Sequence, residues 1–166
     1  MIQAIETFFE ETVGRELCVF FCSLLPIIEL RGAIPLGASL GLAWWQSFIL
    51  SVVGNLLPVP FILLLMRWVL DVMKKIKHLD KIALWLEAKA EKNRAKVEKY
   101  AFWGLILFVA IPLPGTGAWT GSLVASVTGM RFWRSMLCVT VGVLMAGIIM
   151  SLISYGAVAV AAWFSA

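Results

Sequence analysis

Long stretches of uncharged apolar residues constrain this chain more than any other feature. Between Leu17 and Met66 the only formal charges are Glu29 and Arg31, and between Ala101 and Met130 there are none. Of all residues, 61% are hydrophobic and 14% are charged, whereas soluble domains average about 45–50% apolar and about 25% charged. Apolar runs of this length exceed the ~20 residues that a helix needs to cross a bilayer. We therefore expect an all-helical integral membrane protein, with residues 1–166 as a single membrane domain.

One charged segment divides the chain. Residues 67–99 contain ten Lys or Arg and five Asp or Glu, and short basic connections of this kind stay on the cytoplasmic side of the membrane. The segment is predicted to form a basic cytoplasmic helix. The acidic residues 1–16 lack the basic start of a signal peptide and are predicted to form an interfacial helix. Residues 156–166 are predicted to be a C-terminal tail.

The two halves that flank this segment resemble each other. A shift of 88 residues aligns LPIIELRGAIPLGASLGLAWWQSFILSVVG, which begins at Leu25, with LPGTGAWTGSLVASVTGMRFWRSMLCVTVG, which begins at Leu113. Seven positions are identical, and Pro, Gly, Trp, Ser and Gly recur in the same order. We infer an internal repeat, with residues 17–66 as the first copy and residues 100–155 as the second.

Each copy begins with two apolar arms that are too short to cross a membrane. At 1.5 Å per residue, each arm reaches about half of the ~30 Å hydrocarbon core. A full-length apolar run follows each pair of arms, so the predicted unit is a re-entrant helical hairpin plus one spanning helix. The arms are residues 17–28 and 33–43 around Glu29–Gly32, and residues 101–111 and 117–130 around the sequence PLPG; the full-length runs are residues 44–66 and 135–155.

The distribution of charge gives the two copies opposite orientations. The run 44–66 ends at Arg67 in the cytoplasm, so it begins outside and the first hairpin enters from outside. The second hairpin leaves the cytoplasmic segment and returns to the same side, where Arg131 and Arg134 follow it. Inverted repeats of this kind are typical of secondary transporters, which bind their substrate near the midplane between discontinuous helices.

The first hairpin carries the two charges. A charge at the centre of a bilayer costs roughly 2.5–3.5 kcal/mol on insertion scales, so it usually faces a cavity or a partner. We expect an extended break at Glu29–Gly32, in which Glu29 and Arg31 point the same way. Arg31, which keeps its proton, suits an anion such as a phosphate or a carboxylate. Glu29, in a poorly solvated site, suits a proton carrier. The structural alternative is an ion pair that only pins the hairpin.

The second hairpin has no charge but exposes its backbone. Proline and glycine residues leave main-chain N–H and C=O groups there without helical hydrogen bonds. Helix N-termini that point toward such a break favour anions. The predicted substrate site is formed by both tips and comprises Arg31, Gly32, Pro112, Pro114, Gly115, Thr116, Gly117, Trp119 and Thr120. The chain has no nucleophile–base pair and no cluster with metal-ligand spacing, so we expect neither an enzyme nor a metal or other cofactor.

The sequence ELRGAIPLG, followed about 80 residues later by PLPGTGAWTGSL, resembles the small multidrug export protein family of prokaryotic membranes. More distantly, the architecture is similar to that of DedA-type proteins, which have paired re-entrant hairpins and are implicated in moving lipid carriers such as undecaprenyl phosphate. The resemblance implies a multi-pass protein of the prokaryotic inner membrane, and it implies that Glu29 and Arg31 play the roles of the DedA acid and base. The second hairpin departs from DedA proteins because no acidic residue follows the glycine of PLPGTG.

These observations favour a proton-coupled secondary transporter of an anionic amphiphile, such as a lipid-linked phosphate. The expected partners are the lipid bilayer and a second copy of the chain, in a homo-oligomer that is preferably a dimer, and no nucleic acid. The first alternative is an exporter of cationic or amphiphilic drugs, although Arg31 argues against cationic ones. The second alternative is a non-transporting membrane scaffold, in which Glu29 and Arg31 would be sealed and fully paired.

Overall fold

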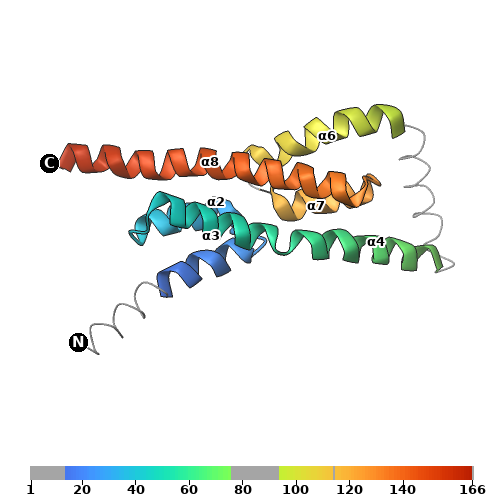
Figure 1. Cartoon of the computed structure of the whole chain (residues 1–166), viewed down its shortest axis with the longest axis horizontal. Coiled ribbons are helices and arrows are strands. Elements are labelled where there is room, and N and C mark those ends of the chain that lie inside the picture. Colours follow the sequence, from blue (N-terminus) through green and yellow to red (C-terminus); the bar gives the residue numbers. More distant parts are fainter. Residues whose placement is uncertain (1–13, 76–93, 114, 166) are drawn as a thin grey trace. The chain divides into compact units, whose positions relative to one another are not determined.

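The computed structural model describes residues 14–75, 94–113 and 115–165, and all regular structure in these residues is helical (Figure 1). The predicted all-helical fold is confirmed for this part of the chain. Residues 1–13 of the predicted interfacial helix and residues 76–93 of the predicted cytoplasmic helix lie outside it. A first helix covers residues 14–24, and the labelled helices are α2 (Glu29–Ser39), α3 (Trp44–Leu56), α4 (Val59–Lys75), α6 (Arg94–Ala110), α7 (Ala118–Val127) and α8 (Phe132–Ser165).

Within the described residues, two helical runs are long and apolar enough to cross a membrane. Trp44–Met66 has 23 residues and a mean hydropathy of 2.3, and Phe132–Ala159 has 28 residues and a mean hydropathy of 2.5. The first run matches the predicted run 44–66, and the second contains the predicted run 135–155 and extends beyond both of its ends. The first run is interrupted by a turn at residues 57–58, because Pro58 has no N–H with which to continue the α-helical hydrogen bonds of α3. The second run is continuous within α8 (Figure 1).

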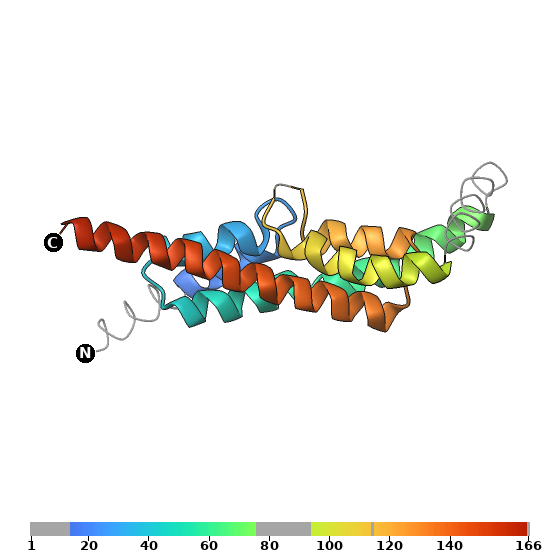
Figure 2. The same ribbon diagram turned by 90° about the horizontal axis from the view of Figure 1, so that it is seen from above.

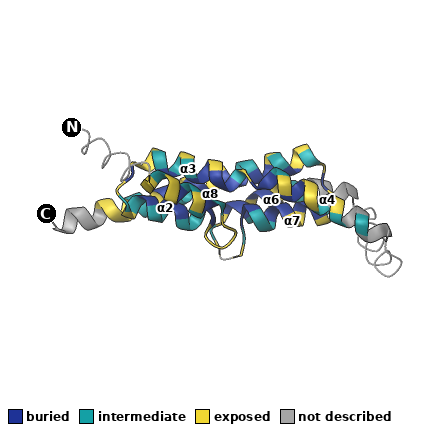
Figure 3. Ribbon diagram, turned by 90° about the horizontal axis from the view of Figure 1, so that it is seen from below, coloured by how far each residue is buried: buried dark blue, intermediate teal, exposed yellow. Residues whose placement is uncertain are grey.

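Large apolar side chains are exposed in this protein as well as buried, and several small polar ones are buried. Large apolar residues such as Phe61, Trp133 and Leu152 are exposed, and Figure 3 shows exposed residues (yellow) alternating with buried ones (dark blue) along the helices. Serine side chains are buried as well, among them Ser23, Ser47, Ser51, Ser122, Ser126 and Ser135. Small residues let membrane helices approach one another closely, while lipid covers the large apolar side chains. This arrangement is that of a membrane protein.

The chain forms two compact units, each built around one hairpin. The first unit comprises Met1–Leu57 and Val143–Ala166, and the second comprises Pro58–Gly142. The division falls within both membrane-length runs, at the turn that separates α3 from α4 and within α8. Each unit therefore contains a hairpin and parts of both runs.

In the first unit, the helix 14–24 and α2 form a hairpin that packs against α3 (Figure 2). Glycines stand where the helices come closest. A Cβ on Gly37 would collide with Ser47, and one on Gly54 would lie 2.7 Å from the main-chain oxygen of Phe20. The C-terminal part of α8 also packs here, since a Cβ on Gly147 would lie 2.7 Å from the ring of Phe48.

In the second unit, α6 and α7 form the hairpin, and α7 also packs against α4. The buried face of α7 consists of small residues, namely Ala118, Gly121, Ser122, Ala125 and Ser126. The N-terminal part of α8 contacts the first arm through Gly142, where a Cβ would lie 2.6 Å from Val109 and 3.0 Å from the main-chain oxygen of Ile106. Small side chains thus permit close contact of the helices in this unit as well.

The turns that follow the two hairpins have the same hydrogen-bond pattern. The glycine of each turn has a positive φ, 76° at Gly41 and 71° at Gly129. The N–H of the residue before the glycine donates to the carbonyl of the residue four positions earlier, at 2.9 Å in both turns. The N–H of the residue after the glycine donates to the carbonyl of the residue five positions earlier, at 3.0 Å in the first turn and 3.1 Å in the second. Glycine ends a helix in this way because it adopts a positive φ without strain. Gly41 and Gly129, which are 88 residues apart in the sequence, therefore have the same local structure.

Candidate functional site

The first hairpin breaks four residues earlier than the sequence predicts. Its first arm ends at residue 24, a turn covers residues 25–28, and α2 begins at Glu29. The prediction of an extended Glu29–Gly32 segment is therefore wrong. Pro26 ends the first arm by restricting Leu25, whereas Pro35 lies inside α2, which continues through it.

Glu29 has an unusual backbone and a buried side chain. Its φ is 50°, and it is the one non-glycine residue with a positive φ in the described part of the chain. This conformation costs an ordinary residue roughly 1–2 kcal/mol. Its side chain is only 6% exposed, and burial of a carboxylate also disfavours folding. Two unfavourable features thus coincide at Glu29, and strained residues of this kind cluster at functional sites.

Arg31 is half-buried and lies close enough to Glu29 for their charges to interact. Both residues belong to the first turn of α2, and the parallel orientation of their side chains stays a prediction. Close packing explains the glycine at position 32, because a Cβ there would lie 2.5 Å from Cγ2 of Ile28. Its predicted contact with substrate stays a prediction.

The second break covers residues 111–117, one residue wider on each side than the gap between the predicted arms. Pro112 precedes Pro114, which lies outside the described residues. Gly115 has a φ of 80°. The Thr116 hydroxyl donates within the loop, with oxygen–oxygen distances of 3.0 Å to the Ile111 carbonyl and 2.9 Å to the Leu113 carbonyl. Thr116 therefore uses its proton to hold the loop and keeps its oxygen as an acceptor.

The start of α7 carries the remaining predicted residues. Gly117 precedes this helix in an extended conformation, and no side chain caps the helix there. Trp119 and Thr120 lie half-buried in the first turn, and the Thr120 hydroxyl donates to the Gly117 carbonyl at 3.5 Å. Glu29, Arg31 and Gly32 thus belong to the first unit, and the residues predicted from the second hairpin belong to the second unit.

In each hairpin, the residues just before the break pack near the middle of a membrane-length run. Ser23 packs against Gly54 in the first unit, and Val109 packs against Gly142 in the second. Gly54 is the eleventh of the 23 residues of Trp44–Met66, and Gly142 is the eleventh of the 28 residues of Phe132–Ala159. The first arm of each hairpin therefore ends beside the central part of a run.

The sequence prediction missed a polar stripe on α3. Ser47, Ser51 and Asn55 follow one another at helical spacing and are all buried, and Asn55 is the central residue of Trp44–Met66. Among the described residues, Ser51 Oγ, Asn55 Oδ1 and Ser151 Oγ are buried without a hydrogen-bond partner. An unpaired polar group is unfavourable in an apolar interior. The four-residue spacing along an otherwise apolar run is the sequence signal that could have identified this stripe.

The exposed apolar surface, the buried serines and the two membrane-length runs define a helical membrane protein. Residues 29–149 match the model of a family described as "Putative small multi-drug export protein", and the chain belongs to this family. The resemblance that was identified from ELRGAIPLG and PLPGTGAWTGSL is thereby confirmed. No curated protein and no solved structure matches the chain.

Proposed function

We propose that this chain is a proton-coupled secondary transporter of an anionic amphiphile, such as a lipid-linked phosphate, in the cytoplasmic membrane of a prokaryotic cell. It acts as a multi-pass carrier and not as an enzyme. The observation that carries the proposal is the buried Glu29 carboxyl group, held in a strained conformation within electrostatic range of Arg31. Strain of this kind is characteristic of functional sites.

The proposed architecture is a pair of inverted repeats, each a re-entrant hairpin plus a spanning helix. Three observations support it. The turns at Gly41 and Gly129 have matching hydrogen bonds, the first arms end beside Gly54 and Gly142 near the middle of each run, and the basic residues cluster between and after the hairpins as the positive-inside rule requires. Helices that end at mid-membrane are tolerated where protein or water lines the break.

The charges suggest how substrate and proton are coupled. When Glu29 is ionised, it neutralises Arg31 and competes with a substrate anion for the guanidinium group. When Glu29 takes up a proton, Arg31 becomes available to grip a phosphate or carboxylate through two parallel hydrogen bonds. The site is neutral in both states, which lowers the electrostatic barrier to movement within the membrane. Substrate and proton then move together, toward the more alkaline side.

The second hairpin completes the proposed site with uncharged groups. Thr116 and Thr120 offer hydroxyl oxygens, Gly115 and Gly117 let the backbone approach the ligand closely, and Trp119 gives an apolar wall. Pro112 keeps this segment from continuing the helix, and Pro114 in the sequence PLPG disfavours a helix for the same reason. In the first unit, the unpartnered Oδ1 of Asn55 adds a hydrogen-bond acceptor. Asn55 follows Gly54, which packs against Ser23 at the end of the first arm. A homodimer would provide the additional helices that a chain of 166 residues needs to enclose a path.

A second candidate function is the export of drugs, which the description of the family favours. In that case Glu29 would exchange a cationic drug for a proton, and the drug would move against the proton. A non-transporting scaffold is the third candidate, in which the Glu29–Arg31 pair would only hold the hairpin. The direction of movement relative to the proton distinguishes the first two candidates, and the absence of movement identifies the third.

The test uses purified protein in liposomes with an imposed pH gradient. One set is loaded with a short-chain polyprenyl phosphate and another with the cationic dye ethidium, while entrapped pyranine reports proton movement. We expect the lipid phosphate to accumulate on the alkaline side together with protons. Movement of ethidium alone, opposite to the proton, would support drug export, and movement of neither compound would support a scaffold.

A further inference from the structure

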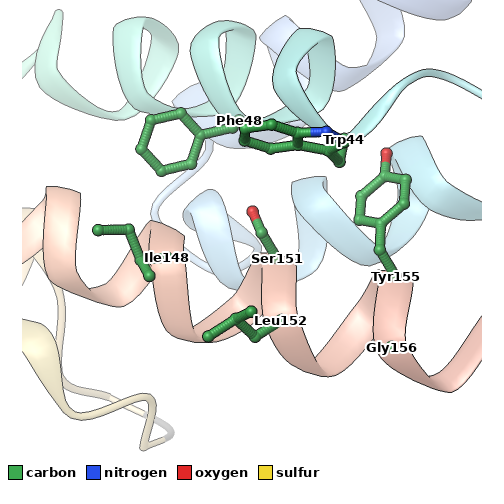
Figure 4. A pocket seen from close by; sticks show the side chains of 7 residues that line it. All are labelled: Trp44, Phe48, Ile148, Ser151, Leu152, Tyr155 and Gly156. Carbon is green, nitrogen blue, oxygen red and sulfur yellow. The ribbon is translucent and has the colours of Figure 1, made fainter.

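A pocket in the first unit is lined by residues other than Glu29 and Arg31. It has a volume of about 560 Å³ and lies between α3 and the C-terminal part of α8 (Figure 4). Its described lining consists of Trp44, Phe48, Ile148, Ser151, Leu152, Tyr155 and Gly156. Small-molecule sites in proteins have volumes of about 300–1,000 Å³ and are mostly apolar with a few polar groups. This pocket has both properties.

Two hydroxyl groups line the pocket, and they differ in their partners. Tyr155 donates to the Leu42 carbonyl at 2.9 Å and lies 2.7 Å from Ser47 Oγ, so its proton is already used. Ser151 is only 8% exposed, and its Oγ has no hydrogen-bond partner. In Figure 4 the Ser151 hydroxyl points from α8 toward α3, into the space beside Trp44 and Phe48. A ligand in this pocket would find one unsatisfied hydroxyl group.

We propose that this pocket binds an uncharged, ring-containing molecule that dissolves in the bilayer and carries one hydrogen-bond acceptor. The absence of charge among the described lining residues excludes an ionised group from the interior. Three aromatic side chains from two helices provide faces and edges for a ring system. The Ser151 hydroxyl requires a polar atom within the apolar body of the ligand, which an acyl chain does not offer.

The position of the pocket favours entry from the lipid. Trp44 is the first residue of the run Trp44–Met66, and Tyr155 lies four residues before the end of Phe132–Ala159, so both rings lie at one end of their runs. The lining of α8 extends from Ile148 to Gly156, about 12 Å along a helix. Ile148 and Leu152 are exposed, which opens this side of the pocket to the hydrocarbon. The proposal is independent of any role of Glu29 and Arg31.

Benzophenone is a suitable probe, because it is neutral, has two rings and offers one ketone oxygen as acceptor. On irradiation the excited ketone takes a hydrogen atom from a nearby C–H group, and the two carbon radicals join, which leaves a tertiary alcohol attached to the protein. Full-length protein in liposomes is irradiated over a range of benzophenone concentrations, and the labelled residues are mapped by mass spectrometry. We expect saturable labelling on the α8 segment that contains Ile148 and Leu152.

Matched variants separate binding from partition into lipid. Ile148→Trp fills the pocket and should reduce saturable labelling at least tenfold, whereas Ile153→Trp, on another face of α8 with similar exposure (57% against 54%), should not. Ser151→Ala should weaken apparent affinity about fivefold, the value of one ordinary hydrogen bond, and Ser151→Thr should restore most of it.

Labelling that is even over the lipid-facing residues and does not saturate would overturn the proposal. Equal labelling of the two tryptophan variants would do the same. If a second copy of the chain covers the pocket instead, the variant Leu152→Cys will form a disulfide-linked dimer in the native membrane while labelling of the pocket is absent. That outcome would replace the ligand by a protein partner and would also contradict the proposal.

Discussion

The hydroxyl oxygen of Tyr155 lies 2.7 Å from Ser47 Oγ and 2.9 Å from the main-chain oxygen of Leu42. Because Tyr155 donates its single proton to Leu42, Ser47 must donate to Tyr155. One phenol group therefore connects α8 to α3 and to the turn that follows α2. These contacts join the C-terminal segment of the chain to its first hairpin.

Tyr155→Phe should lower stability by about 1–3 kcal/mol, because it leaves the buried Ser47 hydroxyl and the Leu42 carbonyl without their partner. For a chain of this size, each kcal/mol corresponds to a shift in melting temperature of about 2–4 °C. Thermal unfolding in detergent measures this change. Tyr100→Phe is the control, because Tyr100 is 74% exposed. This variant should have the melting temperature of the unmodified protein. An unchanged melting temperature for Tyr155→Phe would contradict the assigned contacts.

Gly54→Ala and Gly142→Ala should each destabilise the protein by about 1–3 kcal/mol, because the added methyl group would overlap a main-chain oxygen or Val109 in the neighbouring arm. Gly104→Ala is the matched control in a helix, because a Cβ there would meet nothing within 4 Å. That change should stabilise the protein by up to about 1 kcal/mol. Urea unfolding followed by tryptophan fluorescence measures the stability of the three variants. A similar loss of stability in Gly104→Ala would refute this account of the close contacts.

Glu29→Gly and Glu29→Gln should differ in stability, although both remove the carboxylate. Glycine adopts the φ of 50° without the penalty of roughly 1–2 kcal/mol that a residue with a Cβ incurs. We therefore expect Glu29→Gly to unfold at a higher temperature than Glu29→Gln by a few degrees. Equal melting temperatures would show that the backbone at this position is not strained.

Single cysteines at Ala43 and Arg131 test the inverted orientation. The two positions are 88 residues apart, and both are exposed in the turns that precede α3 and α8. In a background with Cys18, Cys22 and Cys138 replaced by serine, a membrane-impermeant maleimide should label position 43 from outside intact cells. Position 131 should react only after permeabilisation. Labelling of both positions from the same side would eliminate the inverted repeat.

The spanning runs were predictable from sequence because hydropathy is a local property. The run 44–66 coincides with Trp44–Met66, and uncharged residues such as Leu50 and Val53 suffice to identify it. The second break was predictable for a similar reason. Two prolines and two glycines within PLPGTG leave no alternative to a loop at this point.

The first break was harder to place, because the segment offers three competing signals. Pro26, Gly32 and Pro35 each permit a break, and only the three-dimensional packing shows that α2 runs through the last two. The positive φ of Glu29 has no sequence signal at all, since glutamate rarely adopts it. Asn55 was missed because hydropathy alone does not reveal which face of α3 is buried.

The most direct test of the central claim compares Arg31→Lys with Glu29→Gln in liposomes that carry a pH gradient. Arg31→Lys keeps the charge but loses the planar group that grips an oxyanion at two points, so binding of the lipid phosphate should weaken at least tenfold while proton coupling persists. Glu29→Gln cannot ionise, so binding should persist while proton-driven uptake is lost. Uptake that is unchanged in both variants, once corrected for the amount of folded protein, would show that Glu29 and Arg31 only hold the hairpin together.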